Sequence, residues 1–357
     1  MIERLKKEYA LFISIISLII FEIYQHNLAN TLIGNLVGLS IIFGVIIYSA
    51  LSVAHHAELL AEKFGEPYGT LILTMSAVTV EVMIISIMML HAHNPYLARD
   101  TIYSAIMLDI NGLLGLSAII GGLKFGEQPY NIDSSNSYIS MLLVAIGLSM
   151  ILPRSIEPTY KDGFMWFIVV IFILLYVVFT KIQLKDHRYF FEYKKEQKDE
   201  KREHKNLNIN APYHIILLIV YIVAIGFLSE ILALFMENSL QSLGLPLALG
   251  ALGVAVISAS PELIVAIRAS LDNRMQTVIN IALGASLATV LLTIPAVILI
   301  SKFSSLHIEL ALTEIQELLL GLTLIVGIVN FNDGETNVLE GFLHFILFIV
   351  FAFMLFL

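Results

Sequence analysis

The sequence predicts an all-α polytopic membrane protein. Hydrophobic residues make up 58% of the 357 residues and charged residues only 14%, and the mean hydropathy is +0.87. A chain of this composition cannot hide its apolar surface in a soluble core, so lipid must solvate it. A helix that crosses the ~30 Å hydrocarbon layer needs about 20 mostly apolar residues, and runs of this length recur along the whole chain.

We expect eleven transmembrane helices. They are placed near residues 9–26, 30–54, 67–90, 99–122, 137–153, 163–183, 213–232, 245–270, 275–302, 308–330 and 338–357. Basic residues precede the first apolar run, as they do in a cleavable signal peptide, but no small-residue cleavage site follows it. The run is therefore interpreted as the first span.

One strongly polar segment, from Lys181 to Asn210, interrupts the apolar runs. It contains KKEQKDEKREHK, which carries both signs of charge and no apolar stripe, and this composition is typical of a solvated linker. The excess of Lys and Arg in the linker and in the N-terminus predicts that both are cytoplasmic, and the six spans between them agree. We expect an integral protein of the plasma (inner) membrane.

The linker divides the predicted helices into two sets of five. Residues 1–29 hold an extra N-terminal helix, residues 30–184 a first repeat (helices 2 to 6), residues 185–211 the charged linker, and residues 212–357 a second repeat (helices 7 to 11). Because five is odd, the two repeats would be inverted. Inverted repeats are typical of secondary transporters, which place their substrate site near the midplane where the repeats meet.

Two carboxylates lie inside otherwise lipid-compatible spans, Glu81 in the third and Glu262 in the eighth. A charge at the bilayer centre costs ~2.5–3.5 kcal/mol even on insertion scales, so each needs a partner, a cavity or a bound cation. The nearby arginines lie close to span ends, where they can reach the interface instead. Protonation or helix packing is the alternative for either Glu alone, but the matching placement in both halves favours a shared cation and proton site.

Other polar residues supply further candidate ligands. We assign Asn111 in the fourth span and Ser286 in the ninth to the site, because amide and hydroxyl oxygens are hard donors suited to Ca²⁺ or Na⁺. Interhelical hydrogen bonding is an equal alternative for each. Supporting candidates are the small or hydroxyl residues Thr74, Ser76, Ser258, Ser260 and Gly284.

The chain around these candidates gives two more expectations. Pro261 should disturb the eighth helix and free a carbonyl upstream of Glu262, as in discontinuous transporter helices. Asp109 lies two residues before Asn111, on roughly the opposite helix face, so we expect it to stay outside the site. Asp109 could be a second proton carrier or a buried hydrogen-bonding residue, and the sequence leaves both open.

The stretch HHAELLAEKFGEP places His56, Glu58 and Glu66 at the cytoplasmic end of the second span. Such a cluster could relay protons or attract cations to the entrance. The alternative is an amphipathic, solvated helix end.

These features together resemble the cation/Ca²⁺ exchanger superfamily, specifically its bacterial Ca²⁺(Na⁺)/H⁺ antiporter branch. The similarity extends over nearly the whole chain. Its most specific stretches are GEPYGTLILTMSAVTVEV, RDTIYSAIMLDINGLLGLSAIIGG, SASPEL and LGASLATVLLTIPAV. Family members carry an essential acidic residue in each repeat, and by position these would be Glu81 and Glu262. The resemblance implies that both coordinate the cation and exchange it for protons.

The resemblance also bears on the other ligands. The family's usual Asn in the first repeat matches Asn111, and its Gly-Ser-Ser run in the second repeat matches residues 284–286. Ala77 and Val78 lie near the place where many Ca²⁺/H⁺ members have Gly-Asn, and Ala288 stands where a Gln is common in the second repeat, so fewer side-chain oxygens remain. Na⁺ or K⁺ therefore remains an alternative to Ca²⁺.

We therefore expect a secondary antiporter that exchanges a metal cation, Ca²⁺ before Na⁺ or K⁺, for protons by alternating access. Two carboxylates in one small cavity repel each other and are poorly solvated, so protons and the cation should compete for the same oxygens. A passive cation channel or uniporter is the main alternative, because its lining could carry the same residues.

An enzyme is disfavoured. An intramembrane metalloprotease would need a motif such as H-E-x-x-H, a two-aspartate protease would need an intramembrane partner for Asp109, and an ATP-driven pump would need a phosphate-binding loop. The sequence contains none of these, and it contains no cysteine. We expect no cofactor and no nucleic acid partner. Expected partners are membrane lipid and the transported cations and protons, and a homo-oligomer stays open.

Overall fold

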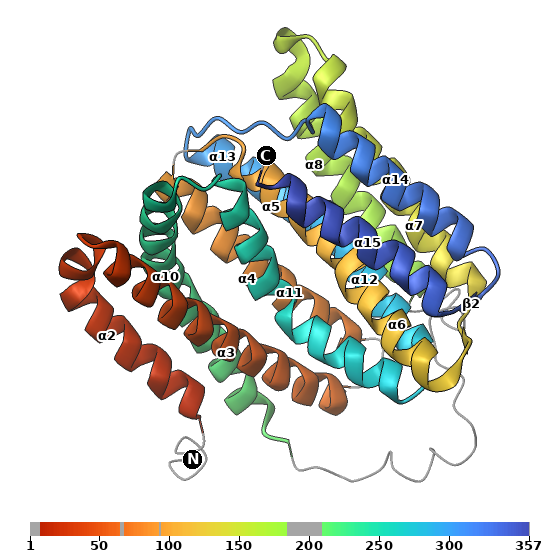
Figure 1. The fold of residues 1–357 in the computed structure, drawn as a ribbon, viewed down its shortest axis with the longest axis horizontal. Coiled ribbons are helices and arrows are strands. Elements are labelled where there is room, and N and C mark those ends of the chain that lie inside the picture. The colour runs from red at the N-terminus through yellow and green to blue at the C-terminus, as the bar shows by residue number, and fades with distance from the viewer. Residues whose placement is uncertain (1–7, 65–67, 93, 184–208, 357) are drawn as a thin grey trace.

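The computed structural model describes residues 8–64, 68–92, 94–183 and 209–356, and these fold almost entirely into helices (Figure 1). The helices, in chain order, are α2 (Tyr9–Ala29), α3 (Leu32–Phe64), α4 (Tyr68–Ala92), α5 (Leu97–Met107), η1 (Leu108–Leu113), α6 (Leu114–Phe125), α7 (Ile132–Ile146), η2 (Gly147–Ile151), η3 (Leu152–Ser155), α8 (Pro158–Lys181), α10 (Ala211–Leu243), α11 (Ala248–Leu271), α12 (Met275–Ala288), η6 (Thr289–Thr293), α13 (Ile294–Phe303), α14 (Glu314–Asn330) and α15 (Val338–Met354). Within the described ranges, nine helical stretches are long and apolar enough to cross a membrane. The shorter α14 and α15, of 17 residues each, supply the remaining two predicted spans. The predicted all-α polytopic fold is confirmed.

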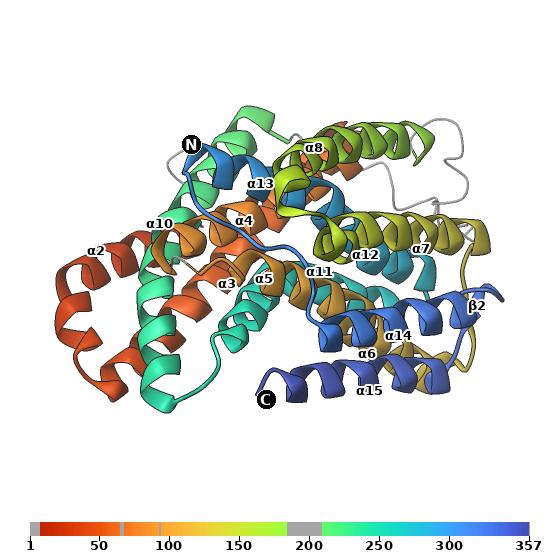
Figure 2. The ribbon, with the colours of Figure 1, turned by 90° about the horizontal axis from the view of Figure 1, so that it is seen from above.

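The helices are arranged in three groups. Figures 1 and 2 show α2, α3 and α10 on one side of the molecule and α7, α8, α14 and α15 on the other. The stretches between them, which contain α5 with α6 and α12 with α13, are the most buried, at 83% and 67% of their apolar windows. The peripheral α2 and α8 reach only 28% and 22%. The most protected environment is therefore at the contact of α4, α5, η1, α11, α12 and η6.

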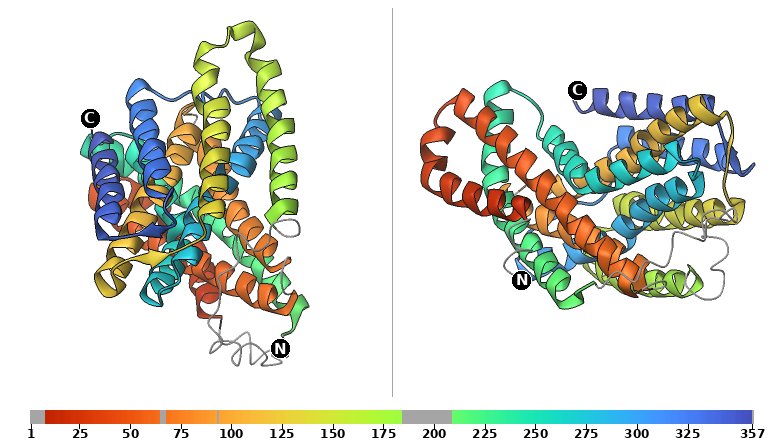
Figure 3. Two further views of the ribbon diagram at one scale, coloured as in Figure 1. Left: turned by 90° about the vertical axis from the view of Figure 1, so that its right-hand side faces the viewer. Right: turned by 90° about the horizontal axis from the view of Figure 1, so that it is seen from below.

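Two helices are longer than the sequence predicted. Both α3 and α10 run for 33 residues, against predicted spans of 30–54 and 213–232. A helix of that length measures about 50 Å, so each must tilt or extend beyond a ~30 Å hydrocarbon layer. The two pack along each other and against α4, and Figure 3 shows them crossing the bundle at a slant.

The central spans contain π-helical turns. The segment η1 interrupts the fourth span, and η6 interrupts the ninth. A π-helical turn inside an α-helix is rare and occurs frequently at functional sites. Both turns lie in the middle of the two most buried spans, which directs attention to the side chains that they present.

Pro261 frees a backbone carbonyl as expected, but it does not make the helix discontinuous. α11 runs from Ala248 to Leu271 with Pro261 inside it. The proline has no N–H for the carbonyl of Ile257 four residues upstream, but the hydroxyl of Ser260 donates to that carbonyl oxygen at 2.8 Å. The freed carbonyl is satisfied locally, so the helix continues.

Two glycines let α15 lie directly against α6. A Cβ on Gly115 would stand 2.8 Å from the backbone nitrogen of Phe345, and a Cβ on Gly341 would stand 2.7 Å from that of Ile119. Small residues of this kind allow helix backbones in membranes to approach closely. The last helix is therefore fixed in register against the fourth span.

A short sheet lies at the end of the bundle where α6 meets the α14–α15 connection. β1 (Gln128–Pro129) and β2 (Glu335–Thr336) pair antiparallel. Strand β2 lies in the FNDGETN segment, residues 331–337, between α14 and α15. The pairing ties the fourth-to-fifth span connection to the connection before α15.

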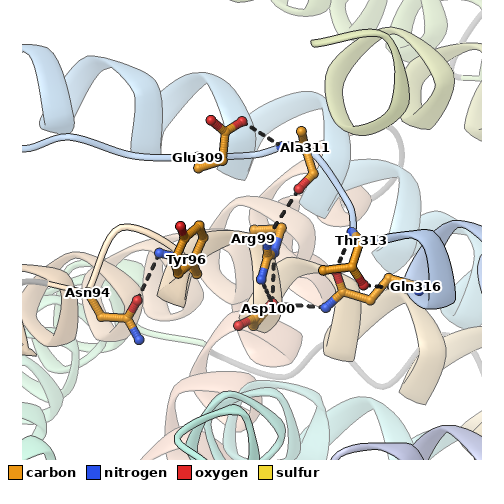
Figure 4. A network of polar contacts seen from close by, with 8 residues as sticks. All are labelled: Asn94, Tyr96, Arg99, Asp100, Glu309, Ala311, Thr313 and Gln316. Carbon is orange, nitrogen blue, oxygen red and sulfur yellow. Dashed lines mark hydrogen bonds and ion pairs between the residues drawn. The ribbon is translucent and has the colours of Figure 1, made fainter. Parts of the chain in front are cut away.

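At the opposite end, residues 304–313 form an extended strap that crosses from α13 to α14. Glu309 donates its N–H to the carbonyl of Pro95 at 2.9 Å, and Leu312 donates its own to the carbonyl of Met150 at 2.8 Å. Figure 4 shows Arg99 paired with Asp100, 2.8 Å apart, and bonded to the carbonyl of Ala311 in the strap.

The strap corrects one predicted boundary. The tenth span begins at Glu314 and not near residue 308, because Thr313 and Gln316 form a reciprocal N-terminal capping box there. Gln316 also donates to Asp100 at 2.9 Å. The start of α14 is thereby joined to the start of α5.

Candidate functional site

Glu81 lies at the contact between α4 and the π-helical turn η6. Its side chain is 4% exposed, and its Oε2 accepts hydrogen bonds from the hydroxyls of Thr289 and Thr293, each at 2.9 Å. Hydrogen bonds to a charged acceptor are stronger than neutral ones. The carboxylate is therefore held by two donors from the other half of the chain.

Asp109 likewise accepts a hydrogen bond from a hydroxyl of the second half, that of Ser286. It lies on η1, is 3% exposed, and its Oδ2 accepts a hydrogen bond from the hydroxyl of Ser286 on α12 at 3.2 Å. It is also near enough to Glu262 and Glu81 to interact with both electrostatically. Glu81 and Asp109 are buried and Glu262 is half-buried, so three acids lie in one region, and the structure adds Asp109 to the two that the sequence brings together.

Two carboxylate oxygens of this group have no donor among the described residues. They are Oε1 of Glu81 and Oε2 of Glu262, both buried. A buried polar atom without a hydrogen-bond partner is unfavourable, and it is more so when the group is charged. The site therefore offers oxygens that a proton or a hard cation would satisfy.

The orientation of Asp109 and Asn111 differs from the prediction in one respect. The two side chains do point in roughly opposite directions, as expected from their spacing, but it is Asp109 that faces the acids. The amide of Asn111 is turned to α14 and α15, where it bonds with Thr323 and His344. The spacing predicts that the two side chains point apart but not which of them faces the acids, because every residue of η1 is buried.

The supporting candidates mostly bond within their own helices. The hydroxyls of Ser76, Ser258 and Ser260 donate to backbone carbonyls three or four residues earlier. Thr74 is partly buried on α4. Gly284 lies against the ring of Tyr138, with 3.5 Å between its would-be Cβ and the phenolic oxygen. Their contribution to ion binding remains a prediction.

The histidine and glutamate cluster at the end of α3 separates into two parts. His56 is buried, with Nδ1 2.9 Å from Nδ1 of His214 and Nε2 3.3 Å from Oε2 of Glu8. Glu58 is exposed, and Glu66 lies outside the described residues. His56 thus joins α3 to α2 and α10, while a relay or entrance role for the cluster remains a prediction.

Thr289 and Thr293 were missed at the sequence level. They follow Ser286 at intervals of three and seven residues, so all three hydroxyls share one helix face. That periodicity was the available signal. It was obscured because the stretch is otherwise apolar and two isolated threonines are common in lipid-embedded helices.

The chemistry of this group is that of hard oxygen donors. Carboxylate and hydroxyl oxygens suit Ca²⁺ and Na⁺ better than soft metals. Across residues 8–64, 68–92, 94–183 and 209–356, no three His, Cys, Asp or Glu side chains are arranged to hold a metal ion as they stand. A transported ion must leave as readily as it enters, so a mixed set of acids and hydroxyls from α4, η1, α11, α12 and η6 fits transport better than permanent binding.

Comparison with known proteins shows which family the sequence matches. Residues 34–185 and 213–357 match the family model described as sodium/calcium exchanger protein. The sodium-potassium/proton antiporter ChaA of Escherichia coli (strain K12) is 34% identical over 308 residues, which cover 85% of this chain and 84% of that protein. The Ca²⁺/H⁺ antiporter ChaA of Bacillus subtilis (strain 168) is 26% identical over 234 residues, or 64% of this chain and 66% of that protein.

Solved structures share the fold. The selenium-substituted crystal structure of the Ca²⁺/H⁺ antiporter protein YfkE superposes with a TM-score of 0.77 at 19% identity, covering 98% of this chain and 99% of that one. The crystal structure of the H⁺/Ca²⁺ exchanger CAX superposes with a TM-score of 0.67, also at 19% identity, covering 98% and 88%.

Proposed function

Because the chain belongs to the sodium/calcium exchanger protein family, we propose that it is a secondary antiporter that exchanges a metal cation for protons. One observation carries this proposal. Glu81, Asp109 and the half-buried Glu262 lie in one region, where hydroxyls from the second half hold two of them and two buried carboxylate oxygens have no donor in the described chain. Such a group is stable only when a proton or a cation compensates its charge.

The mechanism follows from competition for these oxygens. A cation that enters must displace protons from the carboxylates, and protons that return must displace the cation. If the protein changes its open side only when the acids are neutralised, by either route, then exchange is obligatory. Alternating access between the two halves would supply the change of side.

We propose Ca²⁺ as the principal cation. Three acids carry more charge than a monovalent ion can neutralise, and affinity for Ca²⁺ rises with the charge of its ligand set. The name of the Bacillus subtilis relative supports Ca²⁺, and the name of the Escherichia coli relative supports Na⁺ and K⁺. The monovalent ions are therefore tested beside Ca²⁺.

The proposal includes a location and a division of the chain. The basic N-terminus and the charged segment at 185–211 support a cytoplasmic position for both, in the plasma (inner) membrane. Residues 30–184 and 212–357 would be two inverted repeats. In support, Glu81 and Glu262 lie on the second helix of each proposed repeat, and the π-helical turns η1 and η6 lie on the third.

The test uses purified protein in liposomes that enclose a pH dye. Ca²⁺, Na⁺, K⁺ or Mg²⁺ is added outside to the wild type, to Glu81→Gln and to Glu262→Gln. Glu22→Gln is the matched control, because Glu22 is an exposed glutamate on α2. We expect one cation to move protons out of the liposomes in the wild type and control, and neither site variant to respond.

Two results would speak against the proposal. Normal exchange by Glu81→Gln would remove the central carboxylate from the mechanism. Passive equilibration of radioactive cation without any proton movement would identify a channel or uniporter.

A further inference from the structure

Asn111 is engaged at both ends of its amide. Nδ1 of His344 lies 2.9 Å from Oδ1 of Asn111, and Nδ2 of Asn111 donates to the hydroxyl oxygen of Thr323 at 2.8 Å. The Thr323 hydroxyl donates in turn to the carbonyl of Leu319 at 2.9 Å. A carbonyl oxygen only accepts, so His344 must carry its proton on Nδ1.

This chain of hydrogen bonds is sealed inside the protein. The exposed fractions are 0% for Asn111 and Thr323 and 1% for His344. The ring of Phe331 stacks on the imidazole, with centroids 5.6 Å apart and planes 8° from parallel. The close packing of α15 on α6 at Gly115 and Gly341 fixes the backbone that carries His344. The three side chains therefore have little freedom to move.

The three residues come from three different elements. Asn111 lies on η1, Thr323 on α14 and His344 on α15. They meet on the side of η1 opposite to Asp109. Because Asp109 is two residues earlier on the same π-helical turn, whatever fixes the rotation of that turn at Asn111 also fixes the direction of the Asp109 carboxylate.

We propose that His344, Asn111 and Thr323 form a polar brace that positions Asp109 for cation and proton exchange. Asn111 is then a positioning residue and not a ligand. This inference rests on the proposed function, and it adds two residues, from the last two helices, to the machinery of that site. Hydrogen-bonded residues behind a ligand commonly set its orientation and strengthen its binding.

The geometry argues against direct ligation by Asn111. Its carbonyl oxygen would have to leave His344 to reach an ion, and this would leave a buried imidazole N–H without an acceptor. Nε2 of His344 already has no partner in the described part of the chain. Ligation would thus isolate both nitrogens of one buried ring.

Thr323 gives the sharpest test, because it is remote from the acids and has two well-matched substitutions. Thr323→Val keeps the shape and removes the hydroxyl, whereas Thr323→Ser keeps the hydroxyl. Cation-dependent proton release from liposomes is measured for both, together with the thermal midpoint of each protein in detergent. We expect Thr323→Val to raise the apparent KM for the cation about tenfold, the effect of one buried hydrogen bond, and Thr323→Ser to restore it.

The maximal rate separates positioning from folding. With the amount of folded protein matched, Thr323→Val should keep its maximal rate within about twofold of the wild type. A fall in maximal rate at unchanged KM, in step with a lower thermal midpoint, would make the residue merely structural and overturn the brace.

Asn111→Asp separates positioning from ligation. It keeps the oxygen that an ion would use and removes the N–H that Thr323 accepts, so it should raise KM as Thr323→Val does. If Asn111→Asp binds the cation as tightly as the wild type, or if Thr323→Val leaves KM unchanged, the brace is rejected.

A double variant tests whether the brace acts through Asp109. In an Asp109→Asn background, Thr323→Val should change KM by less than about twofold, because the group it positions has lost its charge. Full additivity would contradict the proposal. A wild type that shows no exchange at all would instead remove the proposed function, and the brace with it.

Discussion

The hydroxyl of Thr289 donates a hydrogen bond of 2.9 Å to the carboxylate of Glu81, from a position 208 residues further along the chain. The two residues belong to opposite halves, and each lies inside a membrane-spanning stretch. Because of this bond, the binding of a proton or cation at Glu81 depends on the position of one half of the chain relative to the other. Neutralising Glu81 should weaken this bond, because hydrogen bonds to a charged acceptor are stronger than neutral ones.

The two threonines should therefore matter for exchange. Each threonine donates a hydrogen bond to the Glu81 carboxylate, and removing this donor destabilises the ionised carboxylate. Thr289→Val and Thr293→Val should therefore each raise the apparent KM for the cation by about 10- to 100-fold. Each Thr→Ser variant keeps the hydroxyl and should remain close to the wild type. Cation-dependent proton flux in liposomes is the measurement, and equal flux from the valine and serine variants would show that the hydroxyls are not needed.

Asp109 should contribute to binding of a divalent cation. Asp109→Asn keeps the side-chain volume and removes one negative charge, so Ca²⁺ affinity should fall by about tenfold or more, because affinity depends on the ligands' charge. The effect on Na⁺ should be smaller. Uptake of radioactive Ca²⁺ and Na⁺ in the same preparation decides the matter, with Asp133→Asn, near the start of α7, as the control. Unchanged Ca²⁺ uptake would exclude Asp109 from the site.

Ser260 should stabilise the helix at Pro261. Ser260→Ala leaves the carbonyl of Ile257 without its donor, which should lower the free energy of unfolding by ~1–3 kcal/mol. In a Pro261→Ala background the restored N–H can replace the hydroxyl, so the same change should have little effect. Thermal unfolding in detergent of the four proteins tests this, and an equal loss in both backgrounds would refute it.

The close contact of α6 and α15 should be sensitive to a single methyl group. Gly341→Ala places a Cβ 2.7 Å from the nitrogen of Ile119, and overpacking of this kind typically destabilises by ~1–3 kcal/mol. A Cβ on Gly321 would meet no atom within 4 Å among the described residues beyond its own stretch of helix, so Gly321→Ala is the control. The thermal midpoint should fall for Gly341→Ala only.

Much of the fold could be predicted from sequence, because the bilayer imposes a length and a composition on each span. The positions of Glu81 and Glu262 were evident for the same reason: a carboxylate in an apolar run stands out. The start of α14 at Glu314 was not evident from the sequence, because the strap that precedes it is apolar enough to look like part of a span. Its backbone is satisfied by Pro95 and Met150, which lie far away in the sequence.

The arrangement of the site was harder to predict. Periodicity separates Asp109 from Asn111 but does not say which of them faces the acids, because every residue of η1 is buried. Pro261 breaks a hydrogen bond, yet the neighbouring Ser260 repairs it, and a rule based on proline alone overlooks the repair. Both failures concern contacts that depend on the rotation of one helix or on a side-chain rotamer.

The central claim is that protons and the cation compete for the same carboxylates, and direct binding tests it most simply. Calcium binding to the purified protein is measured by calorimetry from pH 6 to 9, in buffers of different ionisation enthalpy, which reports the protons released. The claim predicts that affinity weakens as the pH falls, that binding releases protons, and that Glu81→Gln and Glu262→Gln bind weakly at every pH. Binding of the same affinity at every pH, without proton release, would contradict it.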